Sequence, residues 1–89
     1  MGTLRLRSIV PNQEIKAFVS KYSGGNDEWF ELLGYFDDSK SSWSRSGWEV
    51  VVFANQSGSQ RKGVYLEIGS KKIDITFKGF DHELEIVYL

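Results

Sequence analysis

The residues of this chain best suited to hold a ligand are short polar side chains that lie beside aromatic rings in segments without regular periodicity. They are Tyr35, Asp37, Asp38, Trp43, Ser57, Gly58, Asp81 and His82. Carboxylate, hydroxyl and imidazole groups can bond the hydroxyls of a sugar, while an aromatic ring covers its C–H face. Loops that bind proteins have a similar composition, so the pattern predicts binding more firmly than it predicts the ligand.

Catalysis is not expected from these residues. His82 is the only conventional base, and its neighbour Asp81 would point the opposite way on a strand. The pair Asp37-Asp38, or Glu83 with Glu85, could in principle hydrolyse a glycoside, but such enzymes need a deep cleft that so short a chain rarely builds. We interpret these acids as solvated and predict that the protein is not an enzyme.

Metals and cofactors are not expected either. The chain has no cysteine and one histidine, and its aspartates lack the alternating spacing of a calcium loop. The glycine-containing segment Ser57–Gly63 is followed by a strand pattern, whereas a phosphate-binding loop precedes a helix. We therefore predict a hairpin loop there.

Length and charge limit the remaining classes. The 89 residues allow one domain, residues 1–89, and 11 basic against 12 acidic residues argue against a nucleic-acid partner. The longest apolar run, Val50–Ala54, is too short to insert into a membrane. The first residues do not fit a signal peptide, which predicts a cytoplasmic or non-classically secreted protein.

A domain this small without disulfides or metal buries little surface, so we expect a homodimer or larger homo-oligomer. The segment Leu84–Leu89 is apolar at alternate positions and is the candidate interface strand.

A period of two runs through most of the chain and predicts strands. Apolar residues alternate with others in Leu4–Arg7, Ile15–Ser20, Val64–Ile68, Ile73–Lys78 and Leu84–Tyr88. The more continuous run Trp48–Phe53 predicts a central strand. Gly69-Ser70 is typical of a tight hairpin turn. The fold class is therefore all-β, a small antiparallel β-sandwich.

One segment, Asp27–Leu33, has two interpretations. It predicts a strand, and the alternative is a short helix capped by Asn26 or Asp27.

Parts of the chain resemble the fungal fruiting-body lectins, a family with an actinoporin-like fold. The matching segments are Thr3–Arg7, Trp43-Ser44, Gly47, Glu49–Val51, Ser57-Gly58, Gly63–Leu66, Ile75–Phe77, Gly79 and Ile86-Val87. The resemblance implies an antiparallel β-sandwich that self-associates and binds galactose-containing glycans. It implies that Ser57 and Gly58 contact the sugar, with Asp81-His82 standing where the family has His-Asn.

Two hypotheses follow. The first is a lectin that recognises galactose-containing oligosaccharides and gains avidity through oligomerisation. The alternative is a small β-sandwich that serves as a protein-interaction or structural assembly module.

Overall fold

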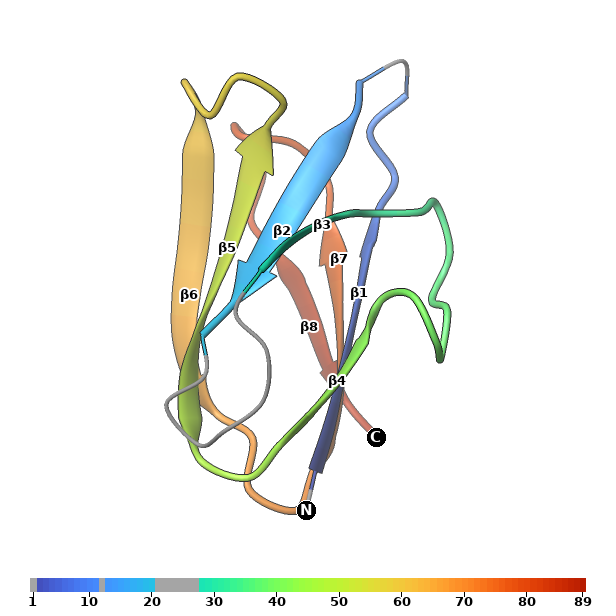
Figure 1. Ribbon diagram of the computed structural model, residues 1–89, viewed down its shortest axis with the longest axis vertical. Helices are drawn as coiled ribbons and strands as arrows, with labels where there is room; N and C mark the ends of the chain where they lie inside the picture. Colours follow the sequence, from blue (N-terminus) through green and yellow to red (C-terminus); the bar gives the residue numbers. More distant parts are fainter. Residues whose placement is uncertain (1, 12, 21–27) are drawn as a thin grey trace.

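The computed structural model describes residues 2–11, 13–20 and 28–89, and these form two four-stranded sheets packed face to face (Figure 1). The strands are β1 (Gly2–Ser8), β2 (Ile15–Val19), β3 (Trp29–Glu31), β4 (Ser42–Arg45), β5 (Trp48–Asn55), β6 (Arg61–Glu67), β7 (Lys72–Phe77) and β8 (Glu85–Tyr88). Sheet A has the order β4-β1-β7-β8 and sheet B the order β3-β2-β5-β6. The predicted small all-β fold is confirmed. The described residues contain no helix long and apolar enough to span a membrane.

The alternation of apolar residues explains why the two sheets face each other. Leu4 and Leu6 in β1 are fully buried, whereas Arg5 and Arg7, which alternate with them, lie on the outer face. In β2 of the opposite sheet, alternate residues are likewise buried, namely Ile15, Ala17 and Val19. Because successive strand residues point to opposite faces, each sheet turns one apolar face inward.

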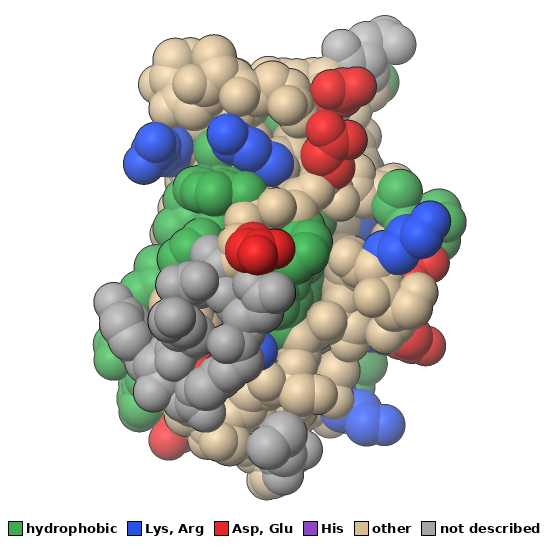
Figure 2. All heavy atoms as spheres, in the orientation of Figure 1, with side chains coloured by type: hydrophobic (Ala, Val, Ile, Leu, Met, Phe, Trp, Pro, Cys, Tyr) green, Lys and Arg blue, Asp and Glu red, His purple; other side chains and the backbone are tan. Residues whose placement is uncertain are grey.

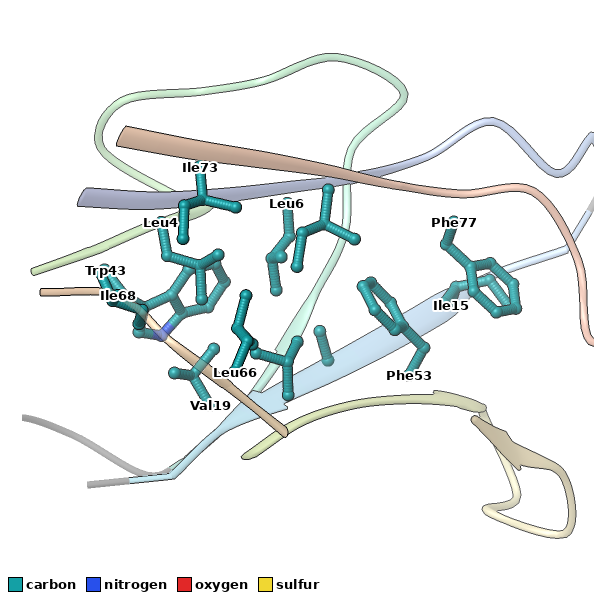
Figure 3. Close-up of a cluster of buried hydrophobic side chains, with 13 residues drawn as sticks. Leu4, Leu6, Ile15, Val19, Trp43, Phe53, Leu66, Ile68, Ile73 and Phe77 are labelled. Carbon is teal, nitrogen blue, oxygen red and sulfur yellow. The ribbon is translucent and has the colours of Figure 1, made fainter. Parts of the chain in front are cut away.

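The core fills the space between the inner faces (Figure 3). Phe53 of sheet B stacks on Phe77 of sheet A with 5.2 Å between ring centroids. Trp43 lies at the other end of the cluster, near Leu4 and Ile68. Burial of these side chains supplies most of the driving force for folding.

Several details differ from the sequence-based expectation. Sheet A is mixed, because β1 and β7 pair in parallel while every other pair is antiparallel. The Gly69-Ser70 hairpin prediction is wrong: β6 lies in sheet B and β7 in sheet A, so this turn connects the two sheets. β4 was not predicted.

Other expectations are confirmed. β5 lies inside sheet B between β2 and β6, as its continuous apolar run indicates. The predicted Ser57–Gly63 loop does connect β5 to β6 in a hairpin, but its last three residues, 61–63, belong to β6. The ambiguous segment contains strand β3 rather than a helix. The proposed helix caps, Asn26 and Asp27, lie outside the described residues.

Candidate binding surfaces

Asp37 organises the turn that precedes β4. Its carboxylate accepts hydrogen bonds from the backbone N–H of Lys40 (2.7 Å), and from the N–H and hydroxyl of Ser39 (both 2.8 Å). The bond from the Lys40 N–H, followed by those from Ser39, lowers the pKa of Asp37 below its ordinary value. The hydroxyl of the fully buried Ser41 closes the same turn by accepting from the Asp37 N–H. Asp37 thus already has structural partners, and it positions its neighbour Asp38.

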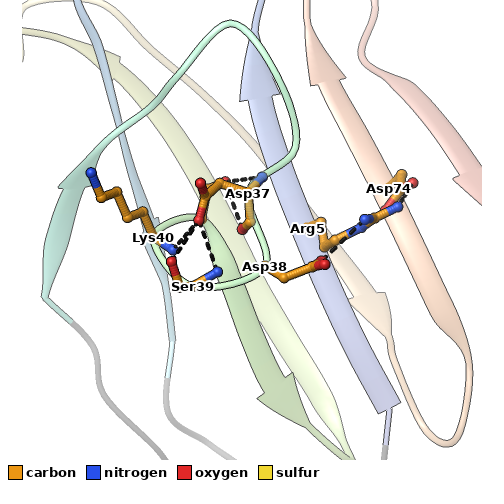
Figure 4. A network of polar contacts seen from close by, with 7 residues as sticks. Arg5, Asp37, Asp38, Ser39, Lys40 and Asp74 are labelled. Carbon is orange, nitrogen blue, oxygen red and sulfur yellow. Dashed lines mark hydrogen bonds and ion pairs between the residues drawn. The ribbon is translucent and has the colours of Figure 1, made fainter.

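Asp38 is joined to sheet A through Arg5 (Figure 4). The Arg5 guanidinium bonds both oxygens of Asp74 at 2.8 and 2.7 Å, and a third N–H reaches Asp38 at 3.1 Å. The bidentate pair with Asp74 is the largest cause of a raised Arg5 pKa. Phe36 lies under the same guanidinium, 5.2 Å away, and under that of Arg7, 4.5 Å away.

Arg5, Asp38 and Asp74 border a pocket of about 420 Å³ on the outer face of sheet A, here called the Asp38 pocket. Its floor is formed by neighbouring strands, since Thr3 pairs with Lys72, and Arg5 pairs with Ser42 and Asp74. Asp38 and Leu89 complete the lining. The pocket therefore brings together one predicted site residue and several polar side chains that the sequence did not point to.

The other predicted site residues lie elsewhere. Trp43 is 6% exposed and packs edge-on against Phe30 in the core, so its ring is not available to stack on a sugar; this part of the prediction is wrong. Tyr35 is exposed on the β3–β4 loop.

Ser57 and Gly58 form the tip of the β5–β6 hairpin. Gly58 has a φ of 76°, a conformation that glycine adopts without strain, and its N–H donates to the carbonyl of Asn55. The Ser57 hydroxyl contacts that of Ser59 at 3.0 Å. The geometry of the turn thus explains the presence of serine and glycine at these positions without a ligand.

Asp81 and His82 are exposed on the β7–β8 loop. In Figure 1 this loop and the β5–β6 loop lie at the same upper end of the sandwich, whereas the β3–β4 loop runs along one side. The structure thus brings Ser57-Gly58 and Asp81-His82 to one end of the sandwich, whereas Asp38 contacts Arg5 of the inner strand β1 in sheet A.

A second surface, which we call the aromatic face, covers the outside of sheet B. Register places Phe18 beside Trp29 and Val52, and Val50 beside Tyr65. Because directly opposed residues share a face, these side chains and Trp48 all point away from the core. Figure 2 shows hydrophobic side chains gathered over β2, β5 and β6, with basic side chains above them.

Two ring clusters occupy this face. Trp48 and Tyr65 stack with 5.1 Å between centroids and an interplanar angle of 28°, yet they remain 49% and 59% exposed. Trp29 packs against Phe18 at 5.5 Å. Lys16 and Arg61 approach the Trp29 ring to 5.1 and 5.9 Å.

Small residues lie on this face beside the Trp29 cluster, where Val52 is opposite Phe18 and Ala54 is fully buried. Ala54 pairs with Arg61, and Gly63 pairs with Val52. A Cβ at Gly63 would lie 3.2 Å from a backbone oxygen of Val51, so a larger residue would fit poorly there. The aromatic face therefore carries one ring cluster near the start of β5 and a second near its middle.

The sequence did contain a signal for this surface. The run Trp48–Phe53 is apolar at both odd and even positions, which means that its outer side chains are apolar too. We interpreted the run only as a central strand.

Across residues 2–11, 13–20 and 28–89, no group of three or more His, Cys, Asp or Glu side chains lies close enough to hold a metal ion. A scan of protein-family models and searches of curated proteins and solved structures find no match to the chain.

Proposed function

We propose that this domain binds carbohydrate through the aromatic face of sheet B. The observation that carries the proposal is the exposed, mutually stacked pair Trp48 and Tyr65, with Trp29 on the same face. Large aromatic rings that remain half exposed on a sheet face cost solubility unless they serve a contact. Pyranose rings stack on such surfaces because their C–H faces are apolar.

The polar groups around the rings support the same ligand class. Lys16 and Arg61 lie against Trp29, and Glu67 pairs with Trp48 across the β5–β6 ladder. Both donors and acceptors of hydrogen bonds are thus available at the border of an apolar platform, as a sugar with its hydroxyl rim requires. The resemblance to fungal lectins adds galactose-containing glycans as the first ligands to test.

A glycan array followed by titration calorimetry tests the proposal. We expect Trp48→Ala and Tyr65→Ala each to weaken glycan binding about tenfold, which corresponds to about 1.4 kcal/mol. Tyr35→Ala is the matched control, because it removes an equally exposed ring from a loop outside the aromatic face. Thermal melts of all three variants identify any loss of folding.

Two results would contradict the proposal. One is binding that Tyr35→Ala reduces as much as Trp48→Ala does. The other is a parent protein that binds no glycan on the array.

The alternative function, a protein-interaction or assembly module, is favoured by a different observation. β8 is an edge strand of sheet A, and Val87, Tyr88 and Leu89 are all exposed there. Edge strands with apolar side chains and free backbone groups tend to pair with another chain. If the parent protein binds no glycan on the array, this alternative is favoured.

A further inference from the structure

The Asp38 pocket lies on the outer face of sheet A, on the opposite side of the sandwich from the aromatic face. It has a volume of about 420 Å³, and its lining comes from β1, β4, β7, the β3–β4 loop and Leu89, which follows β8. Sites for small molecules are typically concave regions of this size with a few converging polar groups.

The polar groups of this pocket are held in place before any ligand arrives. Arg5 is fixed by its two bonds to Asp74, whose side chain is 11% exposed. Asp38 is 85% exposed, yet Arg5 holds one of its oxygens, and the hydrogen-bonded turn of Asp37 fixes its backbone. A ligand that binds here therefore pays little to order these side chains.

The charges of the pocket decide which ligand it suits. The lining side chains include two cations, Arg5 and Lys72, and two carboxylates, Asp38 and Asp74, so their formal charges cancel. An anion bound in the pocket would be repelled by Asp38 and Asp74, and a cation would be repelled by Arg5 and Lys72. A hydroxyl group both donates and accepts, so it can bond to Asp38 and Lys72 alike.

The hydroxyls of Thr3 and Ser42 add two groups that donate or accept as needed, and Leu89 adds an apolar side. We propose that the Asp38 pocket is a binding site for a small, neutral, polyhydroxylated ligand, with the size of a single sugar ring. This site is separate from the aromatic face and does not depend on it. A domain with both sites would hold ligands on opposite sides of one sandwich.

NMR titration of the isotope-labelled protein tests this site. The ligands are methyl β-galactoside and methyl β-glucoside as neutral probes, methyl β-glucuronide as the anion and glucosamine as the cation. We expect the neutral glycosides to shift the backbone amides of Arg5, Ser42 and Asp74, and to do so equally in Trp48→Ala. Shifts confined to Trp48 and Tyr65 would overturn the pocket proposal while leaving the proposed function intact.

Two substitutions measure the contribution of the pocket side chains. Asp38→Asn keeps the size of the side chain but removes its charge, and we expect it to weaken neutral glycosides about tenfold or more. Ser42→Ala weakens them without touching the Arg5 ion pairs. Asp81→Asn, a carboxylate on an exposed loop outside the pocket, is the matched control.

Three outcomes would overturn the proposal. They are the absence of any pocket shift with either neutral probe at tens of millimolar, a clear preference for the glucuronide or for glucosamine, and unchanged affinity in both Asp38→Asn and Ser42→Ala.

Discussion

Removal of the Glu49 carboxylate should strongly destabilise the fold. Glu49 is fully buried and Arg45 is 3% exposed, with 3.7 Å between Arg45 Nε and Glu49 Oε2. The Ser20 hydroxyl donates to Glu49 at 2.6 Å and accepts from the Val50 N–H at 2.8 Å. The Arg45 Nε also donates to the Ser20 carbonyl, so this network joins β4 of sheet A to β5 of sheet B.

The size of the effect follows from this geometry. Two unit charges 3.7 Å apart attract by about 4.5 kcal/mol at an effective dielectric constant of about 20. Desolvation offsets much of that gain in the intact pair, but Glu49→Ala leaves the Arg45 charge buried without this carboxylate and should cost about 3–5 kcal/mol. A domain of 89 residues has a total stability of about 4–13 kcal/mol, so the loss is a large fraction.

Urea denaturation measures these free energies. We expect Glu49→Ala to unfold at much lower urea than the parent, and the double variant Arg45→Met/Glu49→Leu to recover most of the loss, because buried ion pairs can often be replaced by apolar side chains. Glu67→Ala, an exposed glutamate on neighbouring β6, should change stability by less than about 0.5 kcal/mol. If Glu49→Ala matches Glu67→Ala, or if the double variant is less stable than Glu49→Ala, the reasoning is refuted. Should Glu49→Ala fail to fold, the double variant still provides the test.

Two further predictions concern solution behaviour. Hydrogen bonds favour the ionised form of Asp37, so its stabilisation of the turn should be present at neutral pH and disappear as the pH falls through its lowered folded-state pKa. NMR titration of the Ser39 and Lys40 amides should place that pKa below the ordinary value of 3.8. A higher midpoint would contradict the argument. The protein should sediment as a dimer or larger oligomer at micromolar concentration. Val87→Lys should dissociate this oligomer, because a lysine on the edge strand β8 opposes strand pairing. A monomeric parent protein would refute the prediction.

Local patterns predicted most strands because their inner residues are apolar and their outer residues are not. β2 is an example, with Ile15, Ala17 and Val19 inside. β4 was missed because one of its two inward residues is Arg45, whose buried charge hides the alternation. The Gly69-Ser70 turn was recognised as a turn, but the choice between a hairpin and a crossover depends on pairings with strands distant in the chain.

The candidate surfaces were less predictable because they too depend on pairings between strands that are distant in the chain. Residue types alone pointed to Asp38, but not to Arg5 and Asp74, which are 69 positions apart and meet only through the β1–β7 pairing. Trp43 was assigned to a ligand because its place in the core depends on the missed strand β4. The aromatic face likewise depends on the register of four strands.

The parallel pairing of β1 with β7 has a consequence for the order in which the molecule can assemble. All four strands of sheet B end by Glu67, before β7 begins at Lys72. During synthesis, therefore, sheet B can form while β1 still lacks β7, its inner neighbour in sheet A. The inner face of sheet B then has no complete sheet to cover it. Contacts of such large sequence separation slow folding, typically to milliseconds or seconds. We expect the nascent chain to expose the apolar residues of both inner faces until β7 and β8 are made, so that it is most prone to aggregate during this interval.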